Sequence, residues 1–135
     1  MIFWAPVAMH SPHQAPPEYI EKYKGAFDMG WDKAREMILE KQLEMGVIPA
    51  GTKLTKRTAA IPAWDSLPAE EQKLYARQME VFAAMVDLLD QNVGRIVEHL
   101  RKRGILDNTL ILFFSDNGCS GELGRFGMNW SEYTS

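Results

Sequence analysis

Apolar residues recur with helical spacing over one long stretch of the chain, from Pro68 to Arg103. Steps of three and four residues separate Met79, Phe82, Val86, Leu89, Val93, Ile96 and Leu100. This alternation is typical of one face of an α-helix. Glu70 and Glu71 at the start, and a basic cluster before Gly104, suit the two ends of the helix dipole. The pattern predicts a helix over Pro68–Arg103 whose apolar face packs on a sheet, with a dimeric coiled coil as the alternative.

Two shorter helices are predicted before this long one. Pro17 is suited to the first turn of a short helix over Glu18–Lys24, and Gly25 would stop it. A second helix is expected over Gly30–Met45, where apolar side chains repeat along one face and charged ones along the other. Gly46 follows directly, as glycine often does after a last helical turn.

Continuous apolar runs without alternation lie near both ends of the chain. Ile2–Ala8 and Thr109–Phe114 are such runs, and strands buried on both faces have this composition. Residues 47–65 show no sustained period, so a long surface connection is expected there. The order of strand, helices, long helix and strand predicts an α/β crossover unit. The predicted fold class is therefore α/β, with helices packed on a mixed sheet.

Composition and charge narrow the function classes. The chain has 135 residues, 46% of them apolar and 24% charged, as in an ordinary globular protein. Its formal net charge of −3 gives no electrostatic reason to expect nucleic acid or an anionic membrane as a partner. No apolar run approaches the roughly 20 residues that span a bilayer. A single cysteine, Cys119, excludes an internal disulfide.

Polar residues follow both predicted strands. His10 comes after the first strand, and Asp116 and Asn117 come after the second. In open α/β sheets, ligands bind at the carboxyl ends of the strands. A carboxylate and an amide offer oxygen ligands to a divalent cation, and an imidazole can move a proton to a leaving group. The same Asp-Asn-Gly sequence is also that of a plain turn, and a single histidine often has a structural role only.

Several motifs in this order resemble the sulfatase family, in particular the arylsulfatases. Ser115-Asp116-Asn117-Gly118 follows an apolar run and Leu106-Asp107-Asn108-Thr109, as in that family. The opening Ala8–Pro16 is similar to the family's Ala-Pro-His-x-Pro-x-Gln-x-Pro segment. Further similar stretches are Tyr23–Trp31, Pro62–Asp65, Met79–Asp87 and Asn92–Val97. The resemblance covers most of residues 2–120.

The resemblance implies a fold and a set of site residues. Residues 1–135 would be a single partial catalytic domain, truncated at both ends, of the alkaline-phosphatase/sulfatase-like layered type. His10 matches the histidine that contacts the sulfate group and assists the leaving group. Asp116 and Asn117 match a downstream pair of metal ligands, which in sulfatases hold calcium and sometimes magnesium. The substrate would be a small sulfate ester or a sulfated glycan.

Other parts of the family's site have no match in these residues. Sulfatases convert the cysteine of Cys-x-Pro-Ser-Arg to formylglycine, their nucleophile, and this motif is absent here. Cys119 precedes Ser-Gly-Glu-Leu and is interpreted as a small turn residue. The formylglycine and the early Asp-Asp metal ligands would then belong to an upstream segment. The isolated chain is predicted to be catalytically silent, a weak metal binder and prone to self-association.

Two alternatives remain open at this point. A phosphate or phosphonate ester hydrolase of the same superfamily would share the metal ligands and differ in the nucleophile. A non-catalytic helical interaction module would use the long apolar stripe alone, and His10, Asp116 and Asn117 would then be incidental.

Overall fold

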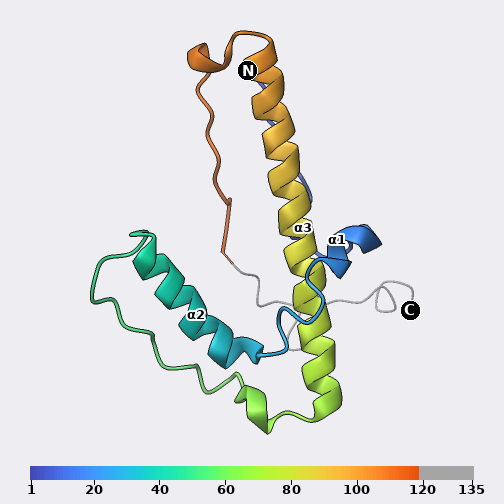
Figure 1. The fold of residues 1–135 in the computed structure, drawn as a ribbon, viewed down its shortest axis with the longest axis vertical. Helices are drawn as coiled ribbons and strands as arrows, with labels where there is room; N and C mark the ends of the chain where they lie inside the picture. The colour runs from blue at the N-terminus through green and yellow to red at the C-terminus, as the bar shows by residue number, and fades with distance from the viewer. Residues whose placement is uncertain (119–135) are drawn as a thin grey trace.

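The computed structural model describes residues 1–118, which contain three α-helices and two short 3-10 helices (Figure 1). In chain order these elements are α1 (Pro17–Glu21), α2 (Gly30–Glu44), η1 (Trp64–Ser66), α3 (Ala69–Lys102) and η2 (Leu106–Asn108). The predicted helices at 30–45 and 68–103 are confirmed to within one residue at each end. The first predicted helix is shorter than expected, because the chain leaves the α-helix after Glu21.

Helix α3 is the longest element of the described residues; α1 and the N-terminal segment lie against it, whereas α2 runs away from it at an angle (Figure 1). Its 34 residues give it a length of about 50 Å. Glu70 and Glu71 stand in the first turn, and Arg101 and Lys102 in the last, so charges oppose the dipole at both ends. Only part of its apolar stripe is covered: Leu89 is buried, whereas Val86 and Ile96 are about two-fifths exposed, at 39% and 41%.

The main core lies where α2, η1 and the start of α3 meet. Trp64 and Tyr75 are buried, and Trp31 packs against both rings. The Trp31 and Trp64 ring centroids are 4.9 Å apart at an interplanar angle of 80°, an edge-to-face arrangement. The Trp31 indole N–H donates to the carbonyl of Pro62 over 3.1 Å, so this large side chain has a polar partner as well as apolar ones.

The long connection between α2 and η1 is tied to α2 by polar contacts. Asp32 accepts a hydrogen bond from the backbone N–H of Trp64 at 2.9 Å and forms an ion pair with Arg57, also at 2.9 Å. Arg35 donates to the carbonyl of Thr55 over 2.7 Å. The connection is therefore a surface segment, as predicted, and it is held in place by one face of α2.

The α/β prediction is wrong for residues 1–118, which contain no strand. Ile2–Ala8 and Thr109–Phe114 are extended segments without a partner strand, and the long helix packs on α1 and the N-terminal segment instead of a mixed sheet. A strand forms its backbone hydrogen bonds only with a neighbour, and Figure 1 shows these two segments apart on different sides of α3. An apolar composition therefore does not make a strand by itself, because it does not supply the neighbouring strand.

The second apolar segment is largely exposed. The exposed fraction is 84% for Leu110, 74% for Leu112 and 73% for both Phe113 and Phe114. Within the part of the chain that the structure describes, no helix is long and apolar enough to cross a membrane. Cys119 and the sequence after it lie outside the described residues.

Candidate functional site

His10 lies in a groove between the N-terminal segment and α3. The groove has a volume of about 220 Å³. Apolar side chains of both walls dominate its lining, and its polar members are His10, Gln14 and Asn92. The His10 side chain is exposed to solvent, and its backbone N–H closes a turn by donating to the carbonyl of Val7 over 3.0 Å. The candidate histidine is thus fixed by a local turn against the middle of the long helix.

The imidazole of His10 has one ring nitrogen engaged. Nδ1 lies 2.7 Å from the carbonyl oxygen of Ser11. Because a carbonyl oxygen only accepts hydrogen bonds, Nδ1 carries the proton in this arrangement. In the neutral ring, Nε2 is then the acceptor, and in the protonated ring it is a second donor. This arrangement suits a group that takes up a proton and gives it to a leaving oxygen at Nε2.

The segment from Tyr19 to Gly25 is joined to α3 by a row of polar side chains, which we call the polar stripe. Its members are Arg77, Glu80, Asp87 and Gln91, and Ala84 lies between them with no exposed surface. The small alanine lets the N-terminal helix approach α3 closely. The stripe is separate from the apolar one: with about 3.6 residues per turn, its residues point to the opposite side of α3 from the row Met79 to Leu100.

Glu80 is the buried carboxylate of this stripe. One oxygen accepts the backbone N–H of Gly25 at 2.8 Å, and the other pairs with Arg77 at 2.6 Å. Burial disfavours the charged form of Glu80, yet the hydrogen bonds from Arg77 and Gly25 outweigh it and hold the pKa below its ordinary value. The side chain therefore stays ionised and fixes the turn that ends the α1 segment.

Asp87 receives donors from two different elements. Lys22 of the α1 segment donates to one carboxylate oxygen over 3.0 Å, and Gln91 of α3 donates to the other over 2.8 Å. Lys22 first, and then Gln91, keep the pKa of Asp87 below its usual value. Tyr23 also contributes to lowering the pKa of Asp87. Tyr19 completes the network by donating to the amide oxygen of Gln91 over 2.8 Å.

Asp116 and Asn117 lie in a polar turn after the extended segment. Both side chains are exposed. The Ser115 hydroxyl donates to the carbonyl of Asn117 over 2.6 Å, and the Asn117 amide nitrogen donates to the carbonyl of Gly118 over 2.7 Å. The amide oxygen of Asn117 and the carboxylate of Asp116 are thus the oxygen atoms that this turn offers to a cation.

Oxygen atoms are the ligands that a hard divalent cation prefers, but this turn supplies too few of them to fill its coordination sphere. Calcium takes six to eight oxygen ligands, and two side chains supply about two or three of them. In residues 1–118 no three His, Cys, Asp or Glu side chains are close enough together to hold a metal ion. The N-terminal segment, which contains His10, and the extended segment that precedes this turn lie on different sides of α3 (Figure 1).

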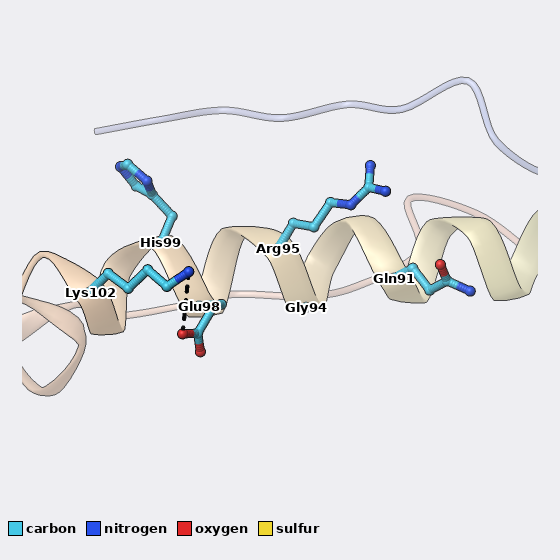
Figure 2. Close-up of a pocket in the computed structure, with 6 residues that line it drawn as sticks. All are labelled: Gln91, Gly94, Arg95, Glu98, His99 and Lys102. Carbon is cyan, nitrogen blue, oxygen red and sulfur yellow. Dashed lines mark ion pairs between the residues drawn. The ribbon is translucent and has the colours of Figure 1, made fainter.

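A second hollow lies on the last turns of α3 and is lined by Gly94 and by the polar side chains of Gln91, Arg95, Glu98, His99 and Lys102. Figure 2 shows Arg95 and His99 projecting from the same side of the helix, toward the N-terminal segment. Lys102 and Glu98 form an ion pair at 3.9 Å along the helix. These are exposed groups on an open helix surface, and none of them belongs to the predicted site.

Sequence reasoning missed the polar stripe that holds the His10 segment. The sequence analysis predicts packing only for the apolar positions of α3 and assigns no contact to Glu80 or Asp87, yet both bind the α1 segment. The available signal was their spacing: Glu80, Asp87 and Gln91 are separated by seven and four residues and share one helical face around Ala84.

The family profile and the similar proteins all indicate the same family. The family profile described as Sulfatase matches residues 1–134. An uncharacterized sulfatase of Schizosaccharomyces pombe is 44% identical over 125 residues, which cover 86% of this chain and 21% of that protein. The arylsulfatase of Klebsiella aerogenes is 32% identical over 126 residues, covering 93% of this chain and 27% of that enzyme.

A human relative matches over a shorter stretch. The N-sulphoglucosamine sulphohydrolase of Homo sapiens is 42% identical over 45 residues, which are 33% of this chain and 9% of that protein. The two longer matches show that the chain spans about a fifth to a quarter of its relatives' length, 21% and 27%.

Proposed function

Because this chain belongs to the sulfatase family, we propose that it forms part of an enzyme that hydrolyses sulfate esters. The observation that carries the proposal is the family match over residues 1–134, together with the similarity to an arylsulfatase along 93% of the chain. We propose a small sulfate ester or a sulfated glycan as the substrate. The relatives compared above are sulfatases or a sulphohydrolase by name, and this supports the substrate class.

His10 is proposed to assist departure of the alcohol or phenol. Hydrolysis breaks the bond between sulfur and the ester oxygen, and that oxygen leaves with an electron pair and needs a proton. With Nδ1 donating to Ser11, the protonated ring offers the proton at Nε2. Transfer of this proton neutralises the developing charge on the leaving oxygen. The exposed position of His10 at the groove is compatible with access to an ester oxygen.

Asp116 and Asn117 are proposed as two of the ligands of a divalent cation, calcium or magnesium. A bound cation would polarise the sulfate oxygens and stabilise charge on them. In the exposed turn, Asp116 supplies the negative charge and Asn117 a neutral amide oxygen. Two ligand side chains leave most of the coordination sphere to water. We therefore expect calcium to bind the isolated chain only in the millimolar range.

The isolated chain is proposed to be catalytically silent. The sequence contains no Cys-x-Pro-Ser-Arg motif, so the nucleophile of the family chemistry would have to come from elsewhere. Calorimetric titration with calcium and an aryl sulfate assay on residues 1–135 test this directly. Micromolar calcium binding that is lost in Asp116→Ala, or turnover that is lost in His10→Ala, would contradict the proposal that the isolated chain is silent and binds calcium weakly.

A chimera tests whether this segment carries sulfatase function. Residues 1–118 would replace the matching segment of the Klebsiella aerogenes arylsulfatase, which supplies the remainder of an active enzyme. We expect the chimera to hydrolyse an aryl sulfate and to prefer it to the matching aryl phosphate. A chimera with native-like helix content and no sulfate turnover, or with a preference for the phosphate, would contradict the proposal.

A further inference from the structure

We propose that Asp87 is a positioning residue that fixes the segment bearing His10 against α3. Asp87 makes its contacts with the α1 segment and not with His10, so it would act on His10 through the intervening chain. The inference rests on the proposed function only in giving His10 a role in catalysis. The anchoring itself is a property of the 135-residue chain and can be measured without turnover.

The first argument is the number of contacts that converge on this carboxylate. Lys22 and Gln91 donate to Asp87 from two different elements, over 3.0 Å and 2.8 Å. The Asp87 side chain is only 18% exposed, whereas that of Lys22 is 50% exposed. Asp87 is therefore the covered member of the ion pair, and both of its oxygens are used. A carboxylate with this many donors holds its partners in one arrangement.

The second argument is that the donors are themselves arranged by their neighbours. The Tyr19 hydroxyl donates to the amide oxygen of Gln91, which leaves the amide nitrogen of Gln91 to donate to Asp87. The Lys22 ammonium also lies 4.4 Å from the centroid of the Tyr19 ring. Removal of the Asp87 carboxylate would thus leave Lys22, Tyr23 and Gln91 without their shared partner. The contact between α1 and α3 would then weaken.

The third argument is that the chain between α1 and His10 is stiff and follows the helix surface. It contains Pro12 and Pro16, and Pro17 follows as the first residue of α1; each proline fixes its own φ angle and restricts the residue before it. Within it, the His13 ring contacts the Phe82 ring of α3 edge-on, with centroids 5.8 Å apart. Pro12 and Gln14 line the same groove as His10. A movement of α1 would be transmitted to His10 through this short segment.

Different faces of α3 contact His10's groove and the α1 segment. Leu88, Leu89 and Asn92 line the His10 groove, and Asp87 and Gln91 lie on the adjoining face that holds α1. The N-terminal segment is therefore fixed at two points along the helix, by apolar packing near His10 and by polar contacts at α1. The polar contacts at α1 thus supplement the local turn and the groove packing near His10, and their loss would change the position of His10.

The experiment compares Asp87→Ala with Asp90→Ala, a matched change at an exposed aspartate three residues further along α3. Nuclear magnetic resonance would follow the ring signals of His10 and His13, and the exchange protection of the His10 backbone N–H, which donates to Val7. His99, near the far end of α3, provides an internal reference.

In Asp87→Ala we expect at least a tenfold loss of His10 amide protection and loss of the ring-current shift that Phe82 imposes on His13. In Asp90→Ala both should stay as in the parent chain.

Two further variants keep the test decisive if Asp87→Ala loses helix content. Lys22→Met removes the ion pair from the α1 side, and Asp87→Asn retains an acceptor for Tyr23 without the charge. Both should shift the His10 and His13 signals in the same direction as Asp87→Ala, and Asp87→Asn by a smaller amount. Unchanged His10 protection in Asp87→Ala or in Lys22→Met, with α3 amides still protected, would overturn the inference. That outcome would leave the proposed sulfatase function standing, because no step of the measurement involves a sulfate ester.

Discussion

Gly30→Ala tests the packing of the core that holds α2 against the start of α3. Gly30 is buried and has a φ of +74°, in the left-handed region that side chains rarely adopt. A Cβ at this position would lie 2.1 Å from Cδ2 and Cγ of Trp64, closer than any real contact. The Trp64 ring would have to move, and it is the ring that packs edge-on against Trp31.

The expected loss of stability follows from two separate costs. The left-handed backbone costs a residue with a Cβ about 1–2 kcal/mol. Overpacking a filled core costs a further ~1–3 kcal/mol. Together, the free energy of unfolding should fall by about 2–5 kcal/mol. With a urea m value of about 1–3 kcal/mol/M, a loss of about 3 kcal/mol moves the unfolding midpoint by ~1 M or more.

Urea unfolding followed by tryptophan fluorescence and far-ultraviolet circular dichroism measures this shift. Gly94→Ala is the matched control, because Gly94 lies inside α3 and a Cβ there meets nothing within 4 Å. The control should raise the stability by about 0.5–1 kcal/mol, the usual gain of alanine over glycine in a helix. A Gly30→Ala midpoint equal to that of the parent chain would refute the packing of Trp64 against this backbone.

Two other measurements probe the exposed and the charged parts of the structure. The pKa of Glu80 is held below its ordinary value of 4.5, so its stabilising effect is present above that pH and is lost as the pH falls through the lower folded value. Glu80→Gln should therefore lower the urea midpoint at pH 7 and have a smaller effect at pH 3; an equal effect at both would contradict the ionised, hydrogen-bonded state. Leu112 is 74% exposed in an apolar segment, so Leu112→Lys should reduce self-association and move the sedimentation mass toward the 15.4 kDa monomer. An unchanged distribution of masses would show that this segment does not mediate association.

The periodic parts of the sequence predicted the helices well, because their signal is local. The acidic first turn and the basic residues before Gly104 indicated the bounds of α3, and the glycine after Met45 indicated the end of α2, each to within one residue. The strands could not be predicted in the same way, since Thr109–Phe114 becomes a strand only beside a second strand. Residues 1–118 do not bring one to it.

The candidate site was only partly visible in the sequence. His10 and the Asp116-Asn117 pair were identified by their motifs, and their roles remain predictions. The contacts that hold the His10 segment were not predicted, because Glu80 and Asp87 have the composition of a solvated helix face. Only the structure shows that these carboxylates meet the backbone N–H of Gly25 and the ammonium of Lys22.

The most direct test of the account is the effect of His10→Ala on aryl sulfate turnover in the arylsulfatase chimera. His13→Ala is the matched control, because it removes an imidazole three residues away that packs on Phe82. General acid assistance is worth about 10²–10⁴-fold, so kcat for a phenol with a high pKa should fall by at least a hundredfold in His10→Ala. His13→Ala should stay within about tenfold of the parent, since no proton transfer is lost. Equal kcat values for His10→Ala and the parent chimera would contradict the central claim that this segment supplies a catalytic group for sulfate ester hydrolysis.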